Sequence, residues 1–397
     1  MANLLHDPER SLYDLAILLK MEEQSLPLSP AGAIHILPAP LGQAKVGMPG
    51  HDVLRLAGRA RGQTRHSISG GFALIENPIG SRQDAISKEP EIDVLMATWN
   101  GSRFIEEQLD SLFCQTFQNF RLIVRDDGSS DTTLQIVEQY RARRPNSVLV
   151  RKNSSRQGAC RNFSLLAAES TAPYFAFSDQ DDIWRPDKLE LELATAKSIE
   201  AEHGIHTAVL VFSDMELVGA DNQLIAHSVW RMKHVNPHRA TLGSMLVQNL
   251  VNGCTVLGNR SLLLQGMPIP EEAFMHDFWL GLVAAAFGTL RPLDATTVRY
   301  RQHQHNTMGA GSGLRIGDAF KRLRGDPSFK QGIERSRRQA EKFSEQYATQ
   351  LSAEQKEILQ AWSQSQNLPA GVRHWTLYRN GLLRTSFLNN IGFLARV

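Results

Sequence analysis

A regular alternation of short apolar segments and amphipathic segments most constrains the fold of this chain. Apolar segments suited to buried strands occupy residues 92–98, 120–124, 148–150 and 174–177. Segments with apolar residues at helical spacing follow them, at residues 102–113, 131–143, 158–169 and 186–200. Each strand-and-helix unit takes about 25 residues, which is typical of a parallel sheet with crossover helices. The pattern therefore predicts a doubly wound α/β sheet, continued by strands at 209–212 and 297–300 and a helix at 278–287.

Composition and charge narrow the class of protein. The chain has 397 residues, of which 42% are hydrophobic, so it can bury a sizeable core in one large domain or in two. Its formal net charge of +2 does not indicate a nucleic-acid-binding protein, so we expect no nucleic-acid partner. The cysteines are Cys114, Cys160 and Cys254, and an odd number without metal-ligand spacing argues against a disulfide framework. We therefore expect a reducing, cytoplasmic location.

The chain divides into three regions. Residues 1–90 contain scattered proline and glycine after a short amphipathic segment at 11–21, which predicts an irregular extension with one short helix. Residues 91–312 carry the strand-and-helix pattern, and residues 313–397 form a basic, helical C-terminal region. Neither a signal peptide nor a transmembrane helix is expected, because no basic segment precedes an apolar one at the N-terminus and no apolar run reaches about 18 residues.

The C-terminal region ends in a basic, amphipathic tail. From residue 369 onward it holds Arg373, Arg379, Arg384 and Arg396 but no acidic residue, and apolar residues lie between the arginines. Such a segment is typical of contact with an anionic membrane surface. Packing of the same helices on the rest of the protein, or a dimer contact, explains the pattern equally well, so both interpretations stay open.

Three carboxylates stand together at the end of the fourth predicted strand. Asp179, Asp181 and Asp182 directly follow the apolar segment 174–177. Like charges this close raise each other's pKa unless a cation neutralises them. No Cys or His is adjacent in sequence, so the set favours a hard ion, Mg²⁺ or Mn²⁺, of the kind that serves phosphate chemistry. The alternative interpretation is a solvated turn.

The first two predicted strands also end in polar turns. Thr98 and Asn100 precede a helix N-terminus, where backbone amides can meet a ligand, although an ordinary strand-to-helix turn has the same sequence. Asp126 and Asp127 follow the second strand and can accept hydrogen bonds from a base imide or a ribose hydroxyl, although solvation alone would explain them. We interpret Asp131 as a helix cap. Ligands bind at the C-terminal ends of such strands, which is where these side chains fall.

Polar positions later in the chain add to this set. Asp277 stands at a predicted helix start among aromatic residues, where it is either a cap or a general base whose pKa is raised by burial. The segment 252–255, Asn-Gly-Cys-Thr, indicates a close approach of the backbone to a ligand. Residues 300–306 place clustered hydrogen-bond donors after a late strand, which suits a diphosphate or a metal.

In this order and spacing, these elements resemble the family-2 glycosyltransferases of the GT-A fold, and most of all the bacterial rhamnosyltransferase type. The resemblance covers about residues 91–309 and rests on the segments 98–101, 126–129, 178–184, 252–255 and 300–303. It implies a nucleotide-diphosphate sugar donor, a divalent metal and inversion at the anomeric carbon.

The resemblance also implies roles for individual residues. Asp277 matches the catalytic base, and Asp181 with Asp179 matches the pair that holds Mg²⁺ or Mn²⁺. The implied donor-binding residues are Thr98, Asn100, Asp126, Asp127, Asp179, Asp182, Trp184 and His303. The implied acceptor loop comprises Asn252, Gly253, Cys254 and Trp279. His276 stands where many members have glutamate, which leaves the role of that second acid open.

Together these expectations describe a metal-dependent, inverting glycosyltransferase. It would move a sugar, with rhamnose as the favoured case, from a dTDP- or UDP-sugar to a growing bacterial surface glycan such as O-antigen or exopolysaccharide. The acceptor is expected to be lipid-linked and the enzyme to be peripheral on the inner face of the cytoplasmic membrane. Two rivals remain: a metal-dependent nucleotidyltransferase or phosphohydrolase, and a degenerate subunit that binds a sugar nucleotide without reacting it.

Overall fold

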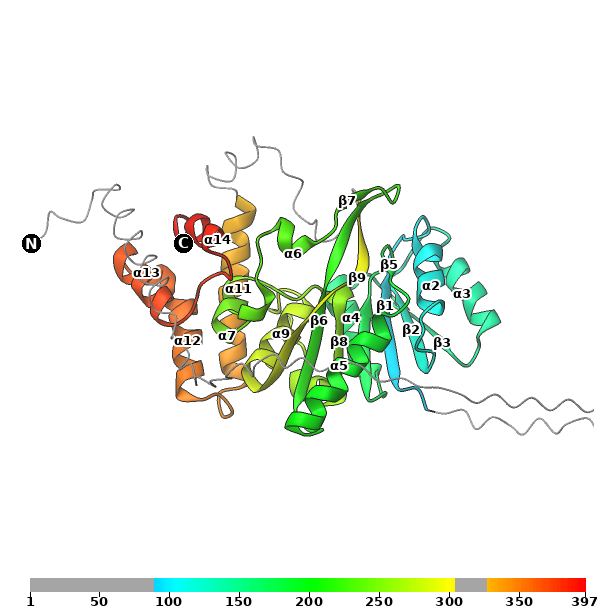
Figure 1. Ribbon diagram of the computed structural model, residues 1–397, viewed down its shortest axis with the longest axis horizontal. Coiled ribbons are helices and arrows are strands. Elements are labelled where there is room, and N and C mark those ends of the chain that lie inside the picture. Colours follow the sequence, from blue (N-terminus) through cyan, green and yellow to red (C-terminus); the bar gives the residue numbers. More distant parts are fainter. Residues whose placement is uncertain (1–88, 304–326) are drawn as a thin grey trace, which may run out of the picture. The chain divides into compact units, whose positions relative to one another are not determined.

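The computed structural model describes residues 89–303 and 327–397 (Figure 1). The helix predicted at 11–21 and the boundary predicted between residues 312 and 313 lie outside these ranges. Within them, no helix combines the length and the apolar character that crossing a membrane requires.

The first half of the sheet is parallel and follows the predicted alternation. Strand β1 (Ile92–Thr98) lies between β2 (Phe120–Asp126) and β4 (Tyr174–Ser178), and β2 pairs with β3 (Val148–Lys152), all in parallel. The strands are connected through α2 (Ile105–Phe113), α3 (Thr133–Arg143) and α4 (Ala159–Glu169). The order β3-β2-β1-β4 shows that the winding reverses beside β1, which confirms the predicted doubly wound α/β class.

The second half of the sheet is mixed. Beyond β4 the order continues through β8 (Val256–Asn259), β6 (Ala208–Gly219), β9 (Gly288–Gln302) and β5 (Ile183–Trp184), with β7 (Leu224–Ala226) paired to β6. Since β8 is antiparallel to both β4 and β6, those two strands point the same way. Strands β6 and β9 pair in parallel along their length and run side by side in Figure 1. Among the described strands only β5, β7 and β8 oppose the common direction, so the sheet is mostly parallel, as predicted.

Strands β6 and β9 extend well beyond the segments predicted at 209–212 and 297–300. The missing part of β9 is half-exposed on both faces and contains Arg291, Pro292 and Asp294, so it lacks the alternation that marks a strand. Pairing with β6, and not the local sequence pattern, therefore extends β9 over these residues. Gly288 begins this strand because a Cβ there would lie 1.9 Å from the carbonyl oxygen of Ala208.

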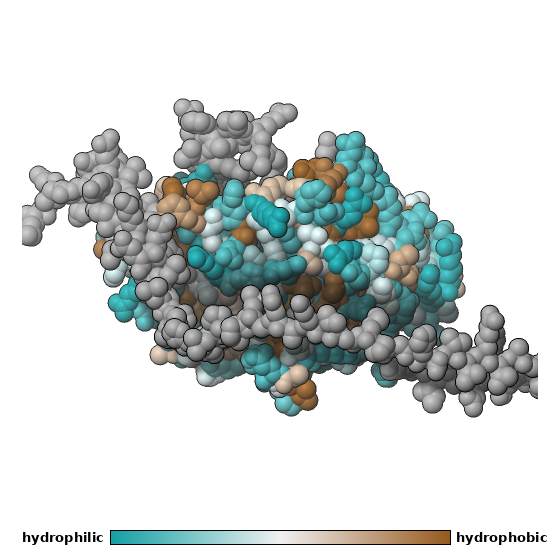
Figure 2. Space-filling view, in the orientation of Figure 1, coloured by the Kyte–Doolittle hydropathy of each residue, from teal (hydrophilic) through white to brown (hydrophobic). Residues whose placement is uncertain are grey.

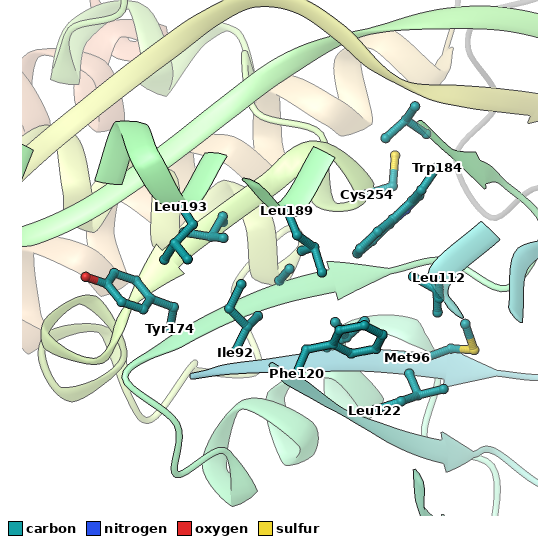
Figure 3. Close-up of a cluster of buried hydrophobic side chains, with 14 of the residues drawn as sticks. Ile92, Met96, Leu112, Phe120, Leu122, Tyr174, Trp184, Leu189, Leu193 and Cys254 are labelled. Carbon is teal, nitrogen blue, oxygen red and sulfur yellow. The ribbon is translucent and has the colours of Figure 1, made fainter. Parts of the chain in front are cut away.

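The hydrophobic core lies between the sheet and its covering helices. Apolar residues of β1, β2 and β4 pack against α2 and α5 (Lys188–His203), as the cluster in Figure 3 shows. Helix α3 begins beside Asp131, whose carboxylate accepts the Thr133 N–H at 3.0 Å and the Ser102 N–H at 3.1 Å. The N-cap residue of α3 is Thr132, whose side chain makes no cap hydrogen bond. The predicted cap is therefore one residue off, although the Asp131 carboxylate does accept an N–H group of the first turn.

The C-terminal region is helical, as predicted. It contains α11 (Pro327–Gln346), α12 (Ala353–Gln364), η3 (Ser365–Asn367), α13 (Ala370–Arg379) and α14 (Phe387–Leu394). Helices α11 and α12 contact each other and α7 (Leu242–Val247), and Phe343 of α11 packs against Trp279 with ring centroids 5.2 Å apart. Leu377 of α13 and Phe393 of α14 are buried as well. Packing therefore accounts for one face of each of these helices.

Candidate active site

A cleft of about 830 Å³ lies at the C-terminal ends of β1, β2 and β4. Its lining includes residues 97–101, 103–104, Asp127, Arg156, 158–159, 162–163, 179–181, Asn249, 252–254, 275–277, Tyr300 and His303. It therefore sits where the winding of the sheet reverses, which is the usual ligand position in such folds. Most of the residues predicted for the site line this one cleft: Thr98, Asn100, Asp127, Asp179, Asp181, Asn252, Gly253, Cys254, Asp277 and His303.

Asp126 organises the turn beneath the cleft. One oxygen of its carboxylate accepts the Thr98 hydroxyl at 2.9 Å and the Ser129 hydroxyl at 2.5 Å. The other accepts the N–H groups of Gly128 and Ser129 at 3.1 and 2.9 Å. The residue is 1% exposed and lies outside the cleft lining. Its hydrogen-bonding capacity is used within the protein, so Asp126 shapes the turn and does not face a ligand.

Asp127 holds the loop that follows β3. Its oxygens accept the Asn153 side-chain amide at 2.8 Å and the N–H groups of Gln157 and Gly158 at 2.7 and 2.8 Å. Gly158 caps the start of α4 with φ of 82°, a left-handed conformation that favours glycine. Asp127 therefore fixes one wall of the cleft.

Gln180 joins the ends of β1 and β4. Its side-chain oxygen accepts the Trp99 N–H at 2.9 Å, and its amide donates to the Trp99 carbonyl at 3.0 Å. Gly101 is needed beside it, because a Cβ there would lie 2.2 Å from the Gln180 side-chain oxygen. The Trp99 ring is 38% exposed, and the Arg156 guanidinium lies 3.6 Å from its centroid. This stack presents a flat, cationic surface at the cleft.

The predicted carboxylate cluster is partly enclosed. Asp179 and Asp181 line the cleft, whereas Asp182 is fully buried and accepts the Arg301 N–H at 3.2 Å. Burial raises the pKa of Asp179 to about 7, with the charges of Asp181 and Asp277 adding to the effect. Burial likewise raises the pKa of Asp182 well above its ordinary value. These shifts show that the negative charges are crowded where solvent does not compensate them.

His303 meets the cluster from the end of β9. Its Nε2 lies 2.7 Å from Oδ2 of Asp181, and its ring lies 4.8 Å from that of Phe104, centroid to centroid. The sequence placed His303 and Asp181 more than a hundred residues apart, and the pairing of β9 with β5 brings them together.

The chemistry of these residues fits a hard divalent cation. Oδ2 of Asp182 is buried without a hydrogen-bond partner among the described residues, and carboxylate oxygens are the ligands that Mg²⁺ and Mn²⁺ prefer. One ligand atom each from Asp179, Asp182 and Cys254 lies within 4.8 Å of the other two. Burial raises the pKa of the Cys254 thiol well above its ordinary value. Hard ions prefer oxygen to sulfur, so the carboxylate oxygens are the candidate ligands.

Asp277 faces the cleft from the start of α9 (His276–Phe287). Its carboxylate accepts the Gly253 N–H at 2.9 Å and the Phe278 N–H at 2.7 Å. The side chain is nevertheless almost fully buried, and burial raises its pKa to about 6. A carboxylate held in one orientation with a pKa in this range is suited to take a proton.

His276 is a neutral packing residue. Its ring stacks on Phe163 with centroids 4.1 Å apart and meets Phe177 edge-on at 4.5 Å. Neither ring nitrogen has a hydrogen-bond partner among the described residues, and burial lowers the pKa to about 3. His276 therefore supplies no acid beside Asp277, and it fixes the start of α9 by packing.

The chain is similar to known proteins over the part that forms this cleft. Residues 93–232 match the model described as "Glycosyl transferase family 2". The chain carries a family-2 glycosyltransferase domain. This agrees with the resemblance seen in the sequence motifs, and it covers the strands that end in the carboxylate cluster.

Curated relatives of this chain come from several bacteria. The dTDP-rhamnosyl transferase RfbG of Shigella flexneri is 27% identical over 241 residues, 57% of this chain and 78% of RfbG. The putative glycosyltransferase EpsE of Bacillus subtilis is 29% identical over 131 residues, 33% of this chain. The chain spans about half the length of EpsE, at 47%.

Solved structures of low identity are also similar. The S. aureus TarS 1–349 complex with UDP-GlcNAc is 17% identical and covers 73% of this chain and 89% of its own, with a TM-score of 0.45. The mannosyltransferase PcManGT from Pyrobaculum calidifontis, in complex with GDP-Man and Mn²⁺, is 16% identical and covers 74% of each chain, with a TM-score of 0.46.

Two residues that were predicted to contact a ligand lie in the core instead. Trp184, expected at the donor, lies 2% exposed in the apolar cluster of Figure 3 beside Leu112 and Leu189. Trp279, expected in the acceptor loop, is fully buried, and its Nε1 donates to the Gly266 carbonyl at 2.9 Å. Asp126 and Asp182 also lie behind the lining, as described above.

Several other residues that line this cleft were not predicted from the sequence to have a role. Gln180 lies between Asp179 and Asp181, just after a predicted strand. That position could have indicated that its side chain lies at the cleft. Arg156 sits in a loop without periodicity, and Tyr300 was noted only as part of a motif. The contact of Arg156 with Trp99 depends on the tertiary fold and left no pattern in the sequence.

Proposed function

We propose that this protein transfers a sugar from a nucleotide-diphosphate donor to a hydroxyl of a bacterial surface glycan, with inversion and with the help of a divalent metal. The observation that carries this proposal is the arrangement of Asp277 against the acidic cluster. Asp277 and Asp179 line the same cleft and lie close enough for the charge of Asp277 to raise the pKa of Asp179. One acid can therefore act on the acceptor while the cluster serves the leaving group.

The leaving-group side of the reaction belongs to Asp179 and Asp181. These carboxylates would hold Mg²⁺ or Mn²⁺, which when bound supplies positive charge for the departing diphosphate. His303 orients Asp181 through its 2.7 Å contact, and Asp182 anchors the segment by accepting the Arg301 N–H. Arg156 on Trp99 offers a cationic, flat surface for a base or a phosphate.

The acceptor side belongs to Asp277. The acceptor oxygen forms a bond to the anomeric carbon as the bond from that carbon to the diphosphate oxygen breaks. The hydroxyl proton moves to the Asp277 carboxylate, which the N–H groups of Gly253 and Phe278 hold in place. A single displacement inverts the configuration and requires no covalent intermediate with the enzyme. Asn252 and Gly253 lie next to this point and would meet the acceptor.

The donor is proposed to be a dTDP- or UDP-sugar, with dTDP-rhamnose first. Support comes from the name of RfbG, a dTDP-rhamnosyl transferase that is 27% identical over 57% of this chain. The residues around Asp179–Trp184 resemble the rhamnosyltransferase type as well.

The acceptor is proposed to be lipid-linked, with the enzyme peripheral on the inner face of the cytoplasmic membrane. Helices α13 and α14 carry Val372, Trp375, Phe387, Leu388 and Ile391, which are 40–61% exposed. Hydrophilic residues cover much of the face drawn in Figure 2, with apolar patches between them. Apolar side chains among arginines are the composition that an anionic membrane surface binds.

A donor panel tests the proposed function. The full chain with Mn²⁺ is screened by thermal shift against dTDP-rhamnose, UDP-GlcNAc and other sugar nucleotides, and the best donor is then incubated with glycan acceptors. Release of nucleoside diphosphate that depends on the acceptor, with an inverted linkage by NMR, supports glycosyl transfer. Pyrophosphate as product would identify a nucleotidyltransferase, and hydrolysis without an acceptor would identify a phosphohydrolase. Donor binding without either reaction would identify a non-catalytic subunit.

A further inference from the structure

A second cavity lies in the C-terminal helical region. It has a volume of about 630 Å³ and is bounded by the first turns of α11, by η3, by α13 and by the residues after α14. It shares no lining residue with the active-site cleft. The proposed sugar transfer assigns no role to it.

The lining of this cavity is strongly basic. Its charged side chains are Glu334 and the six cations Lys330, Arg335, Arg337, Arg338, Arg373 and Arg396. Glu334 is engaged, because its Oε1 lies 3.3 Å from Nε of Arg338. In the described parts of the chain, no side-chain carboxylate lies within ion-pair distance of Arg337, Arg373 or Arg396. The cavity thus gathers positive charge that the described residues do not neutralise.

Two of these arginines are held in place by neutral groups. Arg337 is 8% exposed, and its guanidinium donates to Gln366 at 3.2 Å and to the Ser365 hydroxyl at 2.9 Å. Its Nε and that of Arg373 are buried without an acceptor among the described residues. Arg396 lies over the Phe329 ring, 5.1 Å from the centroid. The guanidinium groups of Arg337 and Arg396 are therefore held in position, and the Nε–H groups of Arg337 and Arg373 remain without an acceptor.

Glu334 is the one acidic side chain of the lining, so it offsets only part of the cost of this arrangement. Burial lowers the pKa of Arg337, the charge of Glu334 opposes this shift and the charge of Arg373 adds to it. Burial also lowers the pKa of the neighbouring Arg384 to about 10. Removing like charges from water is unfavourable unless an anion pairs with them. Phosphate matches the fork geometry of arginine with two parallel hydrogen bonds and spreads its charge over several oxygens.

We propose that this cavity binds a phosphate group, with Arg337, Arg373 and Arg396 as its donors. The group is carried either by a soluble phosphate compound or by the headgroup of an anionic lipid. The exposed apolar residues of α13 and α14 beside the arginines favour the lipid source. The inference does not depend on the proposed sugar transfer, because the two sites share no residue.

The test compares an Arg373→Gln/Arg396→Gln variant with a matched control, Arg379→Gln. Arg379 lies on the same helix as Arg373 but outside the cavity, and its side chain is 67% exposed. Binding of inorganic phosphate is measured by calorimetry at fixed ionic strength with EDTA, which removes any metal-dependent binding in the cleft. We expect the double variant to bind phosphate at least about tenfold more weakly, and the control to bind like the wild type. Equal binding by all three proteins, or no binding by the wild type, overturns the proposal.

Flotation with phosphatidylglycerol vesicles distinguishes the two sources. Loss of flotation in the double variant but not in Arg379→Gln identifies a lipid headgroup, whereas unchanged flotation with lost phosphate binding identifies a soluble phosphate. Should the double variant fail to fold, phenylglyoxal labelling of the wild type replaces it. Phosphate is then expected to protect Arg373 and Arg396 but not Arg379, and equal labelling with and without phosphate contradicts the proposal.

Discussion

The backbone N–H of Gly253 donates to Oδ2 of Asp277 at 2.9 Å, which ties the first turn of α9 to the 3-10 turn η2 (Gly253–Thr255). A side chain at position 253 would crowd this contact, because a Cβ there lies 3.0 Å from Nε2 of His276 and 3.7 Å from the Cβ of Asp277. The glycine that the sequence suggested for a close backbone approach thus approaches the candidate base itself.

Replacing Asp277 with Asn should lower turnover by about 10²–10⁴-fold, because Asn cannot take the acceptor proton. The Asn side-chain oxygen can still accept the Gly253 N–H, so the fold should persist. Turnover and donor affinity are measured together, with Asp294→Asn, an exposed aspartate outside the cleft, as control. Wild-type-like turnover in Asp277→Asn would remove Asp277 as the base, and a parallel loss of donor affinity would assign it to binding.

The pH profile of turnover should report the ionisation of Asp277. Because burial raises the pKa of Asp277 to about 6, the base becomes protonated and turnover falls about tenfold per pH unit below that value. The measurement is kcat between pH 4.5 and 8 at saturating Mn²⁺ and donor, since protons also compete for Asp179, whose pKa burial raises to about 7. A flat profile down to pH 4.5 would show that Asp277 has the pKa of an ordinary aspartate.

Replacing Asp181 with Asn should raise the Mn²⁺ concentration needed for half-maximal activity by about tenfold or more. The amide keeps the size of the side chain but removes the charge that His303 and the cation would share. Metal titrations after EDTA treatment of Asp181→Asn and of the control Asp294→Asn give the comparison. If the metal requirement of Asp181→Asn matches that of the wild type, the ion is held by other residues.

Local sequence predicted the strands that end at the cleft because most of the residues in each of them are apolar. Strand β1 matches its prediction at both ends, and Asp179, Asp181 and Asp277 indeed meet in one cleft. The roles of single polar residues were harder to predict, because they depend on partners distant in sequence. Asp126 accepts the hydroxyls of Ser129, in its own turn, and of Thr98, which only the pairing of β1 with β2 brings to it. Trp184 and Trp279 carried no sequence signal that separates a ligand-stacking ring from a core ring.

The exposed apolar residues of α14 should contribute to membrane binding. Phe387 and Leu388 are 51% and 61% exposed, and burial of such side chains in lipid stabilises by about 1.5–3 kcal/mol each. We expect Phe387→Gln/Leu388→Gln to float with anionic vesicles at least about tenfold less well than the control Leu264→Gln, whose leucine is 69% exposed on α8 (Arg260–Gly266). Point changes are preferable to removing the tail, since truncation would uncover the buried Trp362, whose ring lies 6.1 Å from that of Phe393, centroid to centroid. Equal flotation of variant and control would favour a purely structural tail.

Replacing His276 with Phe should make the protein less sensitive to acid. Burial lowers the pKa of His276 to about 3, so its neutral ring stabilises the fold fully above pH 6.5. As the pH falls from 6.5 towards 3, the unfolded chain takes up a proton at this position that the folded chain does not. The free energy of unfolding of the wild type should therefore fall relative to His276→Phe, by up to about 1.4 kcal/mol per pH unit in this window.

The difference between the two proteins separates the effect of His276 on the pH dependence of stability from the effects of the buried carboxylates. Asp179 and Asp277 have raised pKa values and act with the opposite sign, because the folded chain holds their protons at pH values where the unfolded chain has released them. Both aspartates are present in wild type and variant, so their contributions cancel in the difference. Urea unfolding at pH 7.5, 6.0 and 5.0 measures it. Phenylalanine fits a site already built from Phe163 and Phe177, and it leaves no buried nitrogen without a partner. Parallel pH dependence of the two proteins would mean that His276 titrates in the folded chain as it does in the unfolded chain.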